Sequence, residues 1–386
     1  MDDRVELLIV GGGVAAARAA RTLRRRGFDG SILLVGDDPL PPYNRPPLSK
    51  ELLLHDEPLP DDLLLAEPVA WYDRRAIDLR TDVAVISLDP GERLAGLSDG
   101  GIVRYERCLL ATGAAPHRLP VPGADHAMLL RTAVDARRLR VAMDANPGAE
   151  VVVVGGGFIG LEVASALAVR GLHPTVVELG DVLWGGQLGS GLADWARDRL
   201  AAAGVSLRLG SAVTAVDADA AWVGDERLPA AFVVAGVGVA PRDELARAAG
   251  LAVDDGVVVD GAGRTSEPAI WAAGDVARID GLRVEHWHAA REAGERAALS
   301  ILGEAVPPVA VPWVFSELAG VTVDVFGIPA ADDEARWLVP ERLLAYRRRG
   351  RLVGLVGLGG AIAPETGREL VARGASEADV RGALAG

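Results

Sequence analysis

A glycine-rich motif of the form G-x-G-x-x-G/A occurs twice in this chain, once near the N-terminus and once in the middle. The first copy, residues 11–16, follows the apolar run 5–10, and the second, residues 155–160, follows the apolar run 151–154. Each copy leads into an Ala-rich stretch with helical character. In such a strand–turn–helix unit the turn brings the backbone close to a pyrophosphate, which the helix N-terminus then binds.

One copy of this motif is a weak signal, but two copies in the same context are a strong one. They predict two dinucleotide sites, most simply for FAD and a nicotinamide nucleotide, with electrons passing between them. The cofactor-binding candidates in the two turns are Gly11, Gly13, Ala15, Gly155, Gly157 and Gly160.

An acidic residue follows each motif where an acceptor for ribose hydroxyls is expected. Asp37 and Asp38 lie about 25 positions after Gly11, and both are candidates. Glu178 ends the apolar run 175–177 at the corresponding place in the second unit. A carboxylate there binds both ribose hydroxyls of NADH and repels the 2′-phosphate of NADPH, and no Arg follows closely. We therefore expect NADH rather than NADPH.

Composition excludes several classes of protein. The net charge of −14 disfavours nucleic acid as a partner. No apolar run approaches a membrane span, and the N-terminal residues lack a basic leader, so we expect a cytoplasmic protein with no signal peptide and no membrane partner. Cys108 is the only cysteine, so no intrachain disulfide can form beside a flavin. Its apolar surroundings indicate a small core residue.

The basic residues are distributed unevenly. Arginines cluster at residues 24–26 and at 347–349 with Arg351. These clusters are either solvated ends of helices and strands or a docking surface for an acidic electron carrier. Lys50 is the only lysine among 40 basic residues. Because a compact ammonium and a planar guanidinium are not interchangeable in a tight site, Lys50 is a candidate functional residue.

The order of the expected elements predicts an α/β protein with two Rossmann-like dinucleotide-binding domains, one inserted in the other, and a small α+β C-terminal domain. Gly-rich apolar strands return at 256–260 and 270–275, so the first domain is expected to resume there. Residues 39–60 are rich in proline and are not expected to form regular helix. The expected domains are residues 1–114 with 237–310 (FAD-binding), 115–236 (NADH-binding) and 311–386 (C-terminal interface domain).

Several motifs together resemble the NADH-dependent ferredoxin reductases that serve bacterial oxygenases and cytochromes P450. This group includes putidaredoxin and rubredoxin reductases, and apoptosis-inducing factor is similar. The motifs are the first glycine-rich turn, PYNRPPLSK at 42–50, ATG at 111–113, GGGFIGLE at 155–162 and AGD at 273–275. The resemblance implies that FAD takes hydride from NADH and that single electrons pass to a ferredoxin-type iron–sulfur carrier. The implied chemistry needs no metal and no general base.

The resemblance also assigns roles to individual residues. It implies that Lys50 lies near the isoalloxazine and pairs with Glu162, so these two are the catalytic candidates; a cation there stabilises the reduced flavin. Gly238, at the end of the apolar run 232–238, is a further cofactor-binding candidate. The other implied FAD contacts are Asp37, Arg45, Val83, Arg131, Gly274, Asp275 and Trp287.

The chain departs from the family pattern at several positions, of which Phe315 and Leu318 are expected on the acceptor side. Phe315 stands where relatives carry Trp, Leu318 replaces an amide, and Trp184 lies in a stretch where relatives carry Arg. His286 and His288 flank Trp287 and either tune the flavin or pack as hydrogen-bonded residues.

Two alternatives to a ferredoxin reductase stay open, the first because of the departures on the acceptor side and the second because of the similarity to apoptosis-inducing factor. One is a flavoenzyme that reduces oxygen, a quinone or a small substrate, and the other is a redox-responsive interaction protein. The sequence is compatible with a monomer or a dimer.

Overall fold

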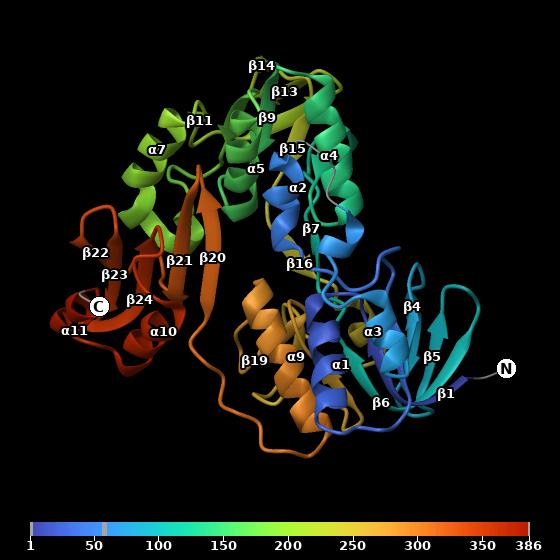
Figure 1. Cartoon of the computed structure of the whole chain (residues 1–386). Coiled ribbons are helices and arrows are strands. Elements are labelled where there is room, and N and C mark those ends of the chain that lie inside the picture. The colour runs from blue at the N-terminus through green and yellow to red at the C-terminus, as the bar shows by residue number, and fades with distance from the viewer. Residues whose placement is uncertain (1–2, 56–59, 385–386) are drawn as a thin grey trace. The chain divides into compact units, whose positions relative to one another are not determined.

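The structure is a computed structural model that describes residues 3–55 and 60–384, and it divides into two compact units (Figure 1). Unit 1 comprises Met1–Arg45, Pro60–Ala115 and Val239–Val309. Unit 2 comprises Pro46–Leu59, Pro116–Gly238 and Ala310–Gly386. Both units combine sheets with packed helices, so the protein has the mixed α/β fold that the sequence predicts. Over the described ranges, no helix has the length and apolar character needed to cross a membrane.

Unit 1 is built on a seven-stranded sheet in the order β3-β2-β1-β6-β5-β4, with β18 also paired to β6. The strands β3, β2, β1, β6 and β18 run parallel, whereas β4 and β5 are antiparallel additions. The bounds are β1 Asp3–Val10, β2 Ile32–Val35, β3 Ile77–Arg80, β4 Val85–Asp89, β5 Leu94–Leu97, β6 Ile102–Leu110 and β18 Ile270–Ala272.

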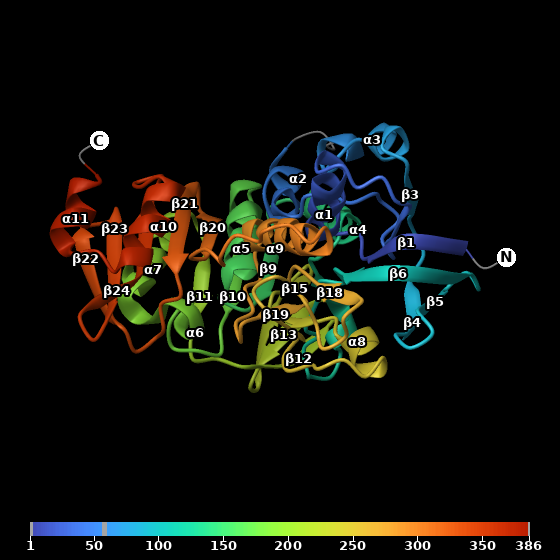
Figure 2. The same cartoon turned by 90° about the horizontal axis from the view of Figure 1, so that it is seen from below.

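The central strands of this sheet are covered on both faces, which explains their continuous apolar runs. Helices α1 (Val14–Arg25) and α9 (Trp287–Ile301) pack with Leu7 and Ile9 on one face. Helix α8 (Glu244–Ala248) and the strands β17 (Val257–Val259) and β19 (Ala277–Ile279) pack with Leu8 and Val10 on the other. Figure 2 shows α1 and α8 on opposite sides of β1 and β6. The remaining elements are η2 Asp61–Leu63, α3 Val69–Arg74 and the pair β7 Ala114–Pro116 with β16 Val239–Pro241.

Cys108 lies in β6, fully buried in this core. Burial raises the pKa of its thiol well above the ordinary value. The prediction that Cys108 is an unreactive core residue is therefore confirmed.

Unit 2 contains a five-stranded parallel sheet in the order β11-β10-β9-β15-β8. An antiparallel three-stranded sheet, β12-β13-β14, lies between β11 and β15 in the sequence. The strands are β8 Ala127–Leu129, β9 Glu150–Val154, β10 His173–Val177, β11 Ser206–Arg208, β12 Val213–Asp217, β13 Ala220–Val223, β14 Glu226–Pro229 and β15 Val233–Ala235. The helices are η1 Pro46–Ser49, α2 Glu51–Leu54, η3 Ala124–His126, α4 Ala133–Ala145, α5 Phe158–Val169, α6 Gly185–Leu188, η4 Gly189–Leu192 and α7 Ala193–Ala202.

The C-terminal part of unit 2 is an antiparallel sheet in the order β20-β21-β24-β23-β22, covered by two helices (Figure 1). Its core gathers Phe326, Leu343 and Leu355 from the strands with Leu370 and Val380 from the helices. The bounds are β20 Trp313–Leu318, β21 Val321–Gly327, β22 Glu334–Val339, β23 Leu343–Arg348, β24 Arg351–Leu358, α10 Pro364–Arg373 and α11 Glu377–Gly382.

The proline-rich segment differs from its expectation. Pro46–Ser49 forms a 3-10 turn and Glu51–Leu54 one turn of α-helix, although no regular helix was expected over 39–60. The helical turn is possible because it begins at Glu51, after Pro47, where every residue has a backbone N–H to donate. These two turns pack on α4 and α5, so they cluster with unit 2 and not with the N-terminal strands.

The arginine clusters mostly serve the fold. The guanidinium of Arg24 donates to the backbone carbonyls of Arg75, Phe28, Gly30 and Ala76. In the second cluster Arg348 pairs with Asp333, while Arg347 and Arg351 donate to backbone carbonyls. These contacts favour the interpretation of both clusters as ends of helices and strands.

Candidate functional site

The strand ends of unit 1 form one row at a single edge of its sheet. The register pairs Val10 with both Val35 and Leu110, and Leu110 with Ala272. The glycine-rich turn after β1, the acidic residues after β2, the ATG motif after β6 and Gly274-Asp275 after β18 therefore meet at that edge. This is the place where open parallel sheets bind ligands.

The turn after β1 requires glycine at one position and leaves space at another. Gly11 has φ +119°, and a Cβ there would lie 2.2 Å from the carbonyl oxygen of Ala111. Gly13 precedes α1, and a Cβ at this position would meet nothing within 4 Å. The first turn of α1 has no acidic residue, and no side chain of the described residues caps it. Its N–H groups are therefore available to an anion, as a diphosphate requires.

Ala15 has a packing role in the same helix. Its side chain is buried, and a Cβ at Gly294 of α9 would lie 2.2 Å from the Ala15 carbonyl oxygen. A Cβ at Gly274 would lie 3.0 Å from the Ala15 Cβ. Small residues at these positions thus let α1, α9 and the end of β18 approach closely.

The two acidic candidates after β2 have different environments. The carboxylate of Asp38 accepts hydrogen bonds from the Leu40 N–H (3.1 Å) and the Tyr43 hydroxyl (2.8 Å), which fix the turn. Asp37 instead pairs with Arg242, at 2.7 Å between Oδ2 and Nη2. Burial acts to raise the pKa of Asp37, but the hydrogen bond and charge of Arg242, with the charge of Arg45, outweigh it and hold this pKa below its usual value. The Asp37 carboxylate is therefore ionised and paired with Arg242, whereas the Asp38 carboxylate is engaged within its own turn.

Other predicted residues lie around this edge of unit 1. The Val83 N–H donates to the Gly36 carbonyl (3.1 Å), and the Arg45 guanidinium lies 5.9 Å from the Tyr43 ring centroid. Trp287 begins α9, and its indole N–H donates to the Asn44 side chain (2.8 Å). The guanidinium of Arg291 lies over the Trp287 ring at 4.5 Å. His286 accepts the backbone N–H of His288 (3.2 Å) as the N-cap of α9, a hydrogen-bonded packing role.

Unit 2 repeats the same construction at the carboxyl ends of β9, β10 and β15. Gly155 has φ +109°, and a Cβ there would lie 2.4 Å from the Gly236 carbonyl oxygen. A Cβ at Gly160 would lie 2.0 Å from the Gly155 carbonyl oxygen, so α5 packs tightly on the turn. Gly157 precedes α5, and a Cβ there would again meet nothing within 4 Å. The cradle thus fits a second diphosphate.

The acidic residue of this second cradle is held by backbone groups. Glu178 Oε2 accepts the Gly156 N–H (2.5 Å), and Oε1 accepts the Gly180 N–H (2.7 Å). Because each carboxylate oxygen has two lone pairs, both can still accept a ribose hydroxyl. Gly238 lies beyond β15, and its carbonyl accepts the His117 N–H (2.9 Å). Arg131 precedes the capping box that Thr132 and Asp135 form at the start of α4.

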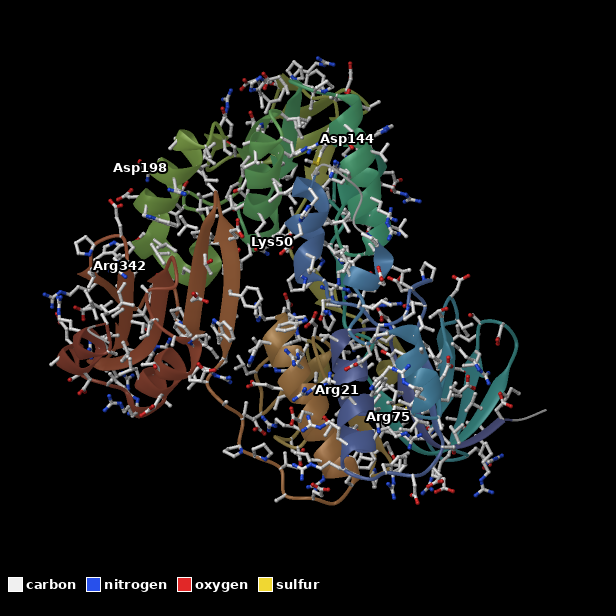
Figure 3. All side chains as sticks on the ribbon, in the orientation of Figure 1. Arg21, Lys50, Arg75, Asp144, Asp198 and Arg342 are labelled. Carbon is white, nitrogen blue, oxygen red and sulfur yellow. The ribbon has the colours of Figure 1, made fainter. Side chains whose placement is uncertain are left out.

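A buried polar cluster in unit 2 contains the only lysine. Lys50 Nζ lies 2.7 Å from Glu162 Oε1, and the two side chains are 15% and 5% exposed. The Ser49 hydroxyl donates to Glu162 Oε2 (2.5 Å) and the Ser316 hydroxyl to Oε1 (2.6 Å). The Glu317 N–H donates to Oε1 as well (3.2 Å). We call Ser49, Lys50, Glu162 and Ser316 the lysine cluster; Figure 3 labels Lys50 near the start of α2.

The lysine cluster joins three segments of unit 2. Glu162 comes from α5, Ser49 and Lys50 from η1 and its end, and Ser316 from β20. A buried carboxylate with a cation and three further donors is fully satisfied, so the ammonium of Lys50 is held in a fixed place. The Lys50–Glu162 contact agrees with what the resemblance implies, whereas the two serines were not among the predicted site residues.

The departures from the family pattern have structural consequences. Leu318, in place of an amide, is 1% exposed at the end of β20. Phe315 is half-buried and packs against Trp313, with ring centroids 5.6 Å apart. Trp184 is buried, has φ +52° and lies against Phe158 at 5.8 Å between centroids.

Sequence reasoning missed several residues that touch the predicted ones, among them Asn44, Ser49, Arg242 and Ser316. Ser49 and Asn44 lie inside the PYNRPPLSK motif, so the motif itself is a signal for them. Arg242 and Ser316 are far from their partners in the sequence, and the pattern of residues carries no signal for either contact.

Comparisons with known proteins agree with this geometry. Residues 5–294 match the family model described as pyridine nucleotide-disulphide oxidoreductase. A ferredoxin–NAD(+) reductase component of the biphenyl dioxygenase system of Paraburkholderia xenovorans (strain LB400) is 37% identical over 333 residues, 83% of this chain and 80% of the relative. Rubredoxin–NAD(+) reductase of Pseudomonas putida is 34% identical over 335 residues, 83% of this chain and 86% of the relative.

Solved structures are similar along the whole chain. The covalent putidaredoxin reductase–putidaredoxin complex gives a TM-score of 0.90 at 28% identity, over 100% of this chain and 99% of the other. The ferredoxin reductase for the CYP199A2 system of Rhodopseudomonas palustris gives 0.87 at 31% identity, over 97% of this chain and 100% of the other. Together with the paired cradles and the lysine cluster, these matches establish that the chain belongs to the pyridine nucleotide-disulphide oxidoreductases and, within them, to the NADH-dependent ferredoxin reductases.

Proposed function

We propose that this protein uses FAD to take hydride from NADH and passes electrons singly to a ferredoxin-type iron–sulfur carrier that serves an oxygenase or a cytochrome P450. The single observation that carries the proposal is the pair of open, glycine-lined helix N-termini, each with an acidic residue at the neighbouring strand end. Two relatives, at 37% and 34% identity, are a ferredoxin reductase and a rubredoxin reductase, which supports an iron–sulfur protein as the acceptor.

The first cradle is proposed to hold FAD, in a domain formed by residues 1–114 and 237–310. When bound, FAD supplies the group that accepts hydride and releases single electrons. The N–H groups of the first turn of α1 bind the diphosphate, and the guanidinium of Arg45 offsets its charge. Asp37 accepts from the adenosine ribose. The further proposed FAD contacts in this domain are Gly11, Gly13, Ala15, Val83, Gly274, Asp275 and Trp287. Arg131, which the resemblance also implies, lies outside it, in residues 115–236.

The second cradle is proposed to hold NADH, in a domain formed by residues 115–236. The first turn of α5 binds the diphosphate beside Gly157, while Glu178 accepts from the ribose. Gly155 and Gly160 shape the backbone around this site, and Gly238, just beyond the end of this domain, is a further proposed cofactor contact. Residues 311–386 form the proposed interface domain, whose β20 reaches the lysine cluster through Ser316.

Within the lysine cluster, Glu162 is proposed to orient Lys50 and Lys50 to supply a fixed positive charge. Such a charge stabilises negative charge that develops on a reduced cofactor. The two serine hydroxyls and the Glu317 N–H keep the Glu162 carboxylate from turning away. No proton needs to move at Lys50 for this role, so the pair acts through position and electrostatics.

Glu178→Ala is expected to raise the KM for NADH about tenfold or more, because the ribose hydroxyls lose a charged acceptor. The KM for NADPH should change much less, since its 2′-phosphate is no longer repelled. Steady-state reduction of an artificial acceptor, with each nucleotide in turn, measures the ratio of the KM for NADH to the KM for NADPH. Glu226→Ala removes an exposed carboxylate in β14 that pairs with Arg208 at 2.9 Å and serves as the control. An unchanged NADH/NADPH ratio in Glu178→Ala would contradict the role given to this residue.

Anaerobic stopped-flow mixing tests the proposed function as a whole. The purified protein with FAD is mixed with NADH or NADPH, and the reduced protein is then mixed with oxidised ferredoxin or with oxygen. Fast reduction by NADH and fast reoxidation by ferredoxin are expected. Reoxidation by oxygen alone would identify a different flavoenzyme, and reduction too slow for turnover would identify a redox-responsive protein.

A further inference from the structure

Arg242 is fixed at the ligand-binding edge of the unit 1 sheet by its own backbone. It directly follows β16, and its N–H donates to the Gly113 carbonyl (2.9 Å). Its carbonyl accepts the Thr112 hydroxyl (2.7 Å). Thr112 and Gly113 follow Ala111, whose carbonyl oxygen would lie 2.2 Å from a Cβ at Gly11. The backbone of Arg242 is thus bound to the segment that follows β6, beside the first cradle.

The side chain of Arg242 returns to the acidic residue of the same cradle. Its Nη2 donates to Asp37 Oδ2 at 2.7 Å, across a sequence separation of 205 residues. The two side chains are 43% and 42% exposed, so the pair lies at the surface of the edge and not in the core. Among the described residues, Arg242 is the side chain that donates to the Asp37 carboxylate, whereas Asp38 is engaged by Leu40 and Tyr43.

The charges around this pair favour an ionised, fixed carboxylate. The positive charges of Arg242 and Arg45 lower the pKa of Asp37. The negative charge of Glu244, at the start of α8, contributes to raising the pKa of Arg242. The neighbouring carboxylate of Asp38 has its own two donors. A carboxylate that is already oriented loses little conformational entropy when it accepts a hydroxyl, so its orientation contributes to affinity.

We propose that Arg242 is a positioning residue for the adenosine end of the first dinucleotide site, where it holds Asp37 in the orientation that accepts the ribose hydroxyls. The inference rests on the proposed function, in which Asp37 is the ribose acceptor. Because Asp37 would contact only the adenosine, Arg242 would increase the affinity only of ligands that carry an adenosine, and it would therefore contribute to ligand specificity. FAD carries one, and FMN does not.

The test compares FAD and FMN binding to the full chain after removal and re-addition of flavin. In Arg242→Gln the Kd for FAD should rise about tenfold, the loss expected for a charge-assisted hydrogen bond at a partly exposed site. The Kd for FMN should not change. Arg227→Gln is the matched control, because Arg227 pairs with Asp219 at the same 2.7 Å and is 40% exposed in the β13–β14 hairpin. Equal FAD binding by Arg242→Gln and wild type, or equal losses for FAD and FMN, would overturn the proposal.

A double-mutant cycle with Asp37→Asn tests whether Arg242 acts through Asp37. Asp37→Asn and the double variant should bind FAD equally weakly. The affinity for FAD in Arg242→Gln should also begin to fall at a higher pH than in wild type, since Asp37 then protonates more readily; a purely structural role would not shift this profile. Additive losses or an unchanged pH profile would overturn the inference.

Failure of this inference is distinguishable from failure of the proposed function. If wild-type protein binds FAD and NADH reduces it rapidly while Arg242→Gln is indistinguishable from wild type, only the role of Arg242 is wrong. If wild-type protein binds FAD and FMN with the same affinity, no adenosine subsite exists, and both Asp37 and Arg242 lose their assigned roles.

Discussion

Replacing Glu162 with Ala is expected to lower the free energy of unfolding by about 3–5 kcal/mol, because it leaves a buried ammonium without its counter-charge. Lys50 Nζ lies 2.7 Å from the Glu162 carboxylate in a site that is almost closed to solvent. The substitution also removes the acceptor for Ser49, Ser316 and the Glu317 N–H. Urea denaturation of the flavin-free protein measures the loss without a contribution from cofactor binding.

The partner substitution Lys50→Met should cost less than Glu162→Ala. In that variant the carboxylate keeps two hydroxyl donors and one backbone donor, and the methionine stem replaces the lysine stem in the same space. A loss of about 1–2 kcal/mol is expected. Glu226→Ala, which breaks an exposed pair with Arg208, should cost at most about 1 kcal/mol. If Glu162→Ala is no more destabilising than Glu226→Ala, the lysine cluster does not hold η1, α5 and β20 together.

The two glycine-rich turns could be predicted because local backbone geometry determines them. At Gly11 and Gly155 both the positive φ and the neighbouring carbonyl exclude a side chain, so the residue type at these positions carries the structural information. The acidic residues after β2 and β10 follow from the length of one strand–helix–strand unit. The spacing alone left both Asp37 and Asp38 open, and the hydrogen bonds of Asp38 to Leu40 and Tyr43 could not be predicted from it.

Contacts between distant segments could not be predicted from the sequence pattern. Ser316 and Glu162 are separated by 154 residues, and Arg242 and Asp37 by 205. Neither pair is marked by periodicity or spacing, because each depends on how separate elements pack. The Lys50–Glu162 pair was expected only through the family resemblance, for the same reason. Leu318 shows the converse: its replacement of an amide reads as a functional change in the sequence, whereas the structure buries it.

Replacing Gly157 with Val is expected to raise the KM for NADH at least about 100-fold while FAD stays bound. Gly157 has an extended backbone (φ −84°, ψ −175°) that other residues adopt, and nothing lies within 4 Å of the Cβ position. The fold should therefore tolerate the side chain at a cost of at most about 1 kcal/mol. The valine would occupy the space over the first turn of α5 and displace the diphosphate, with the loss of two or more charge-assisted hydrogen bonds.

Two further glycine variants separate occupation of a cradle from damage to the fold. Gly13→Val should give the opposite phenotype, a folded protein that loses FAD, because the same open position exists at the start of α1. Gly160→Ala should instead lower the thermal midpoint, since its Cβ would lie 2.0 Å from the Gly155 carbonyl oxygen. Flavin absorbance, the rate of reduction by NADH and thermal unfolding distinguish the three. If Gly157→Val loses FAD, or if NADH reduces this variant with the wild-type KM, the second cradle is not the NADH site. When NADH lies on α5 and FAD on α1, each valine should weaken the binding of one cofactor and leave the other bound.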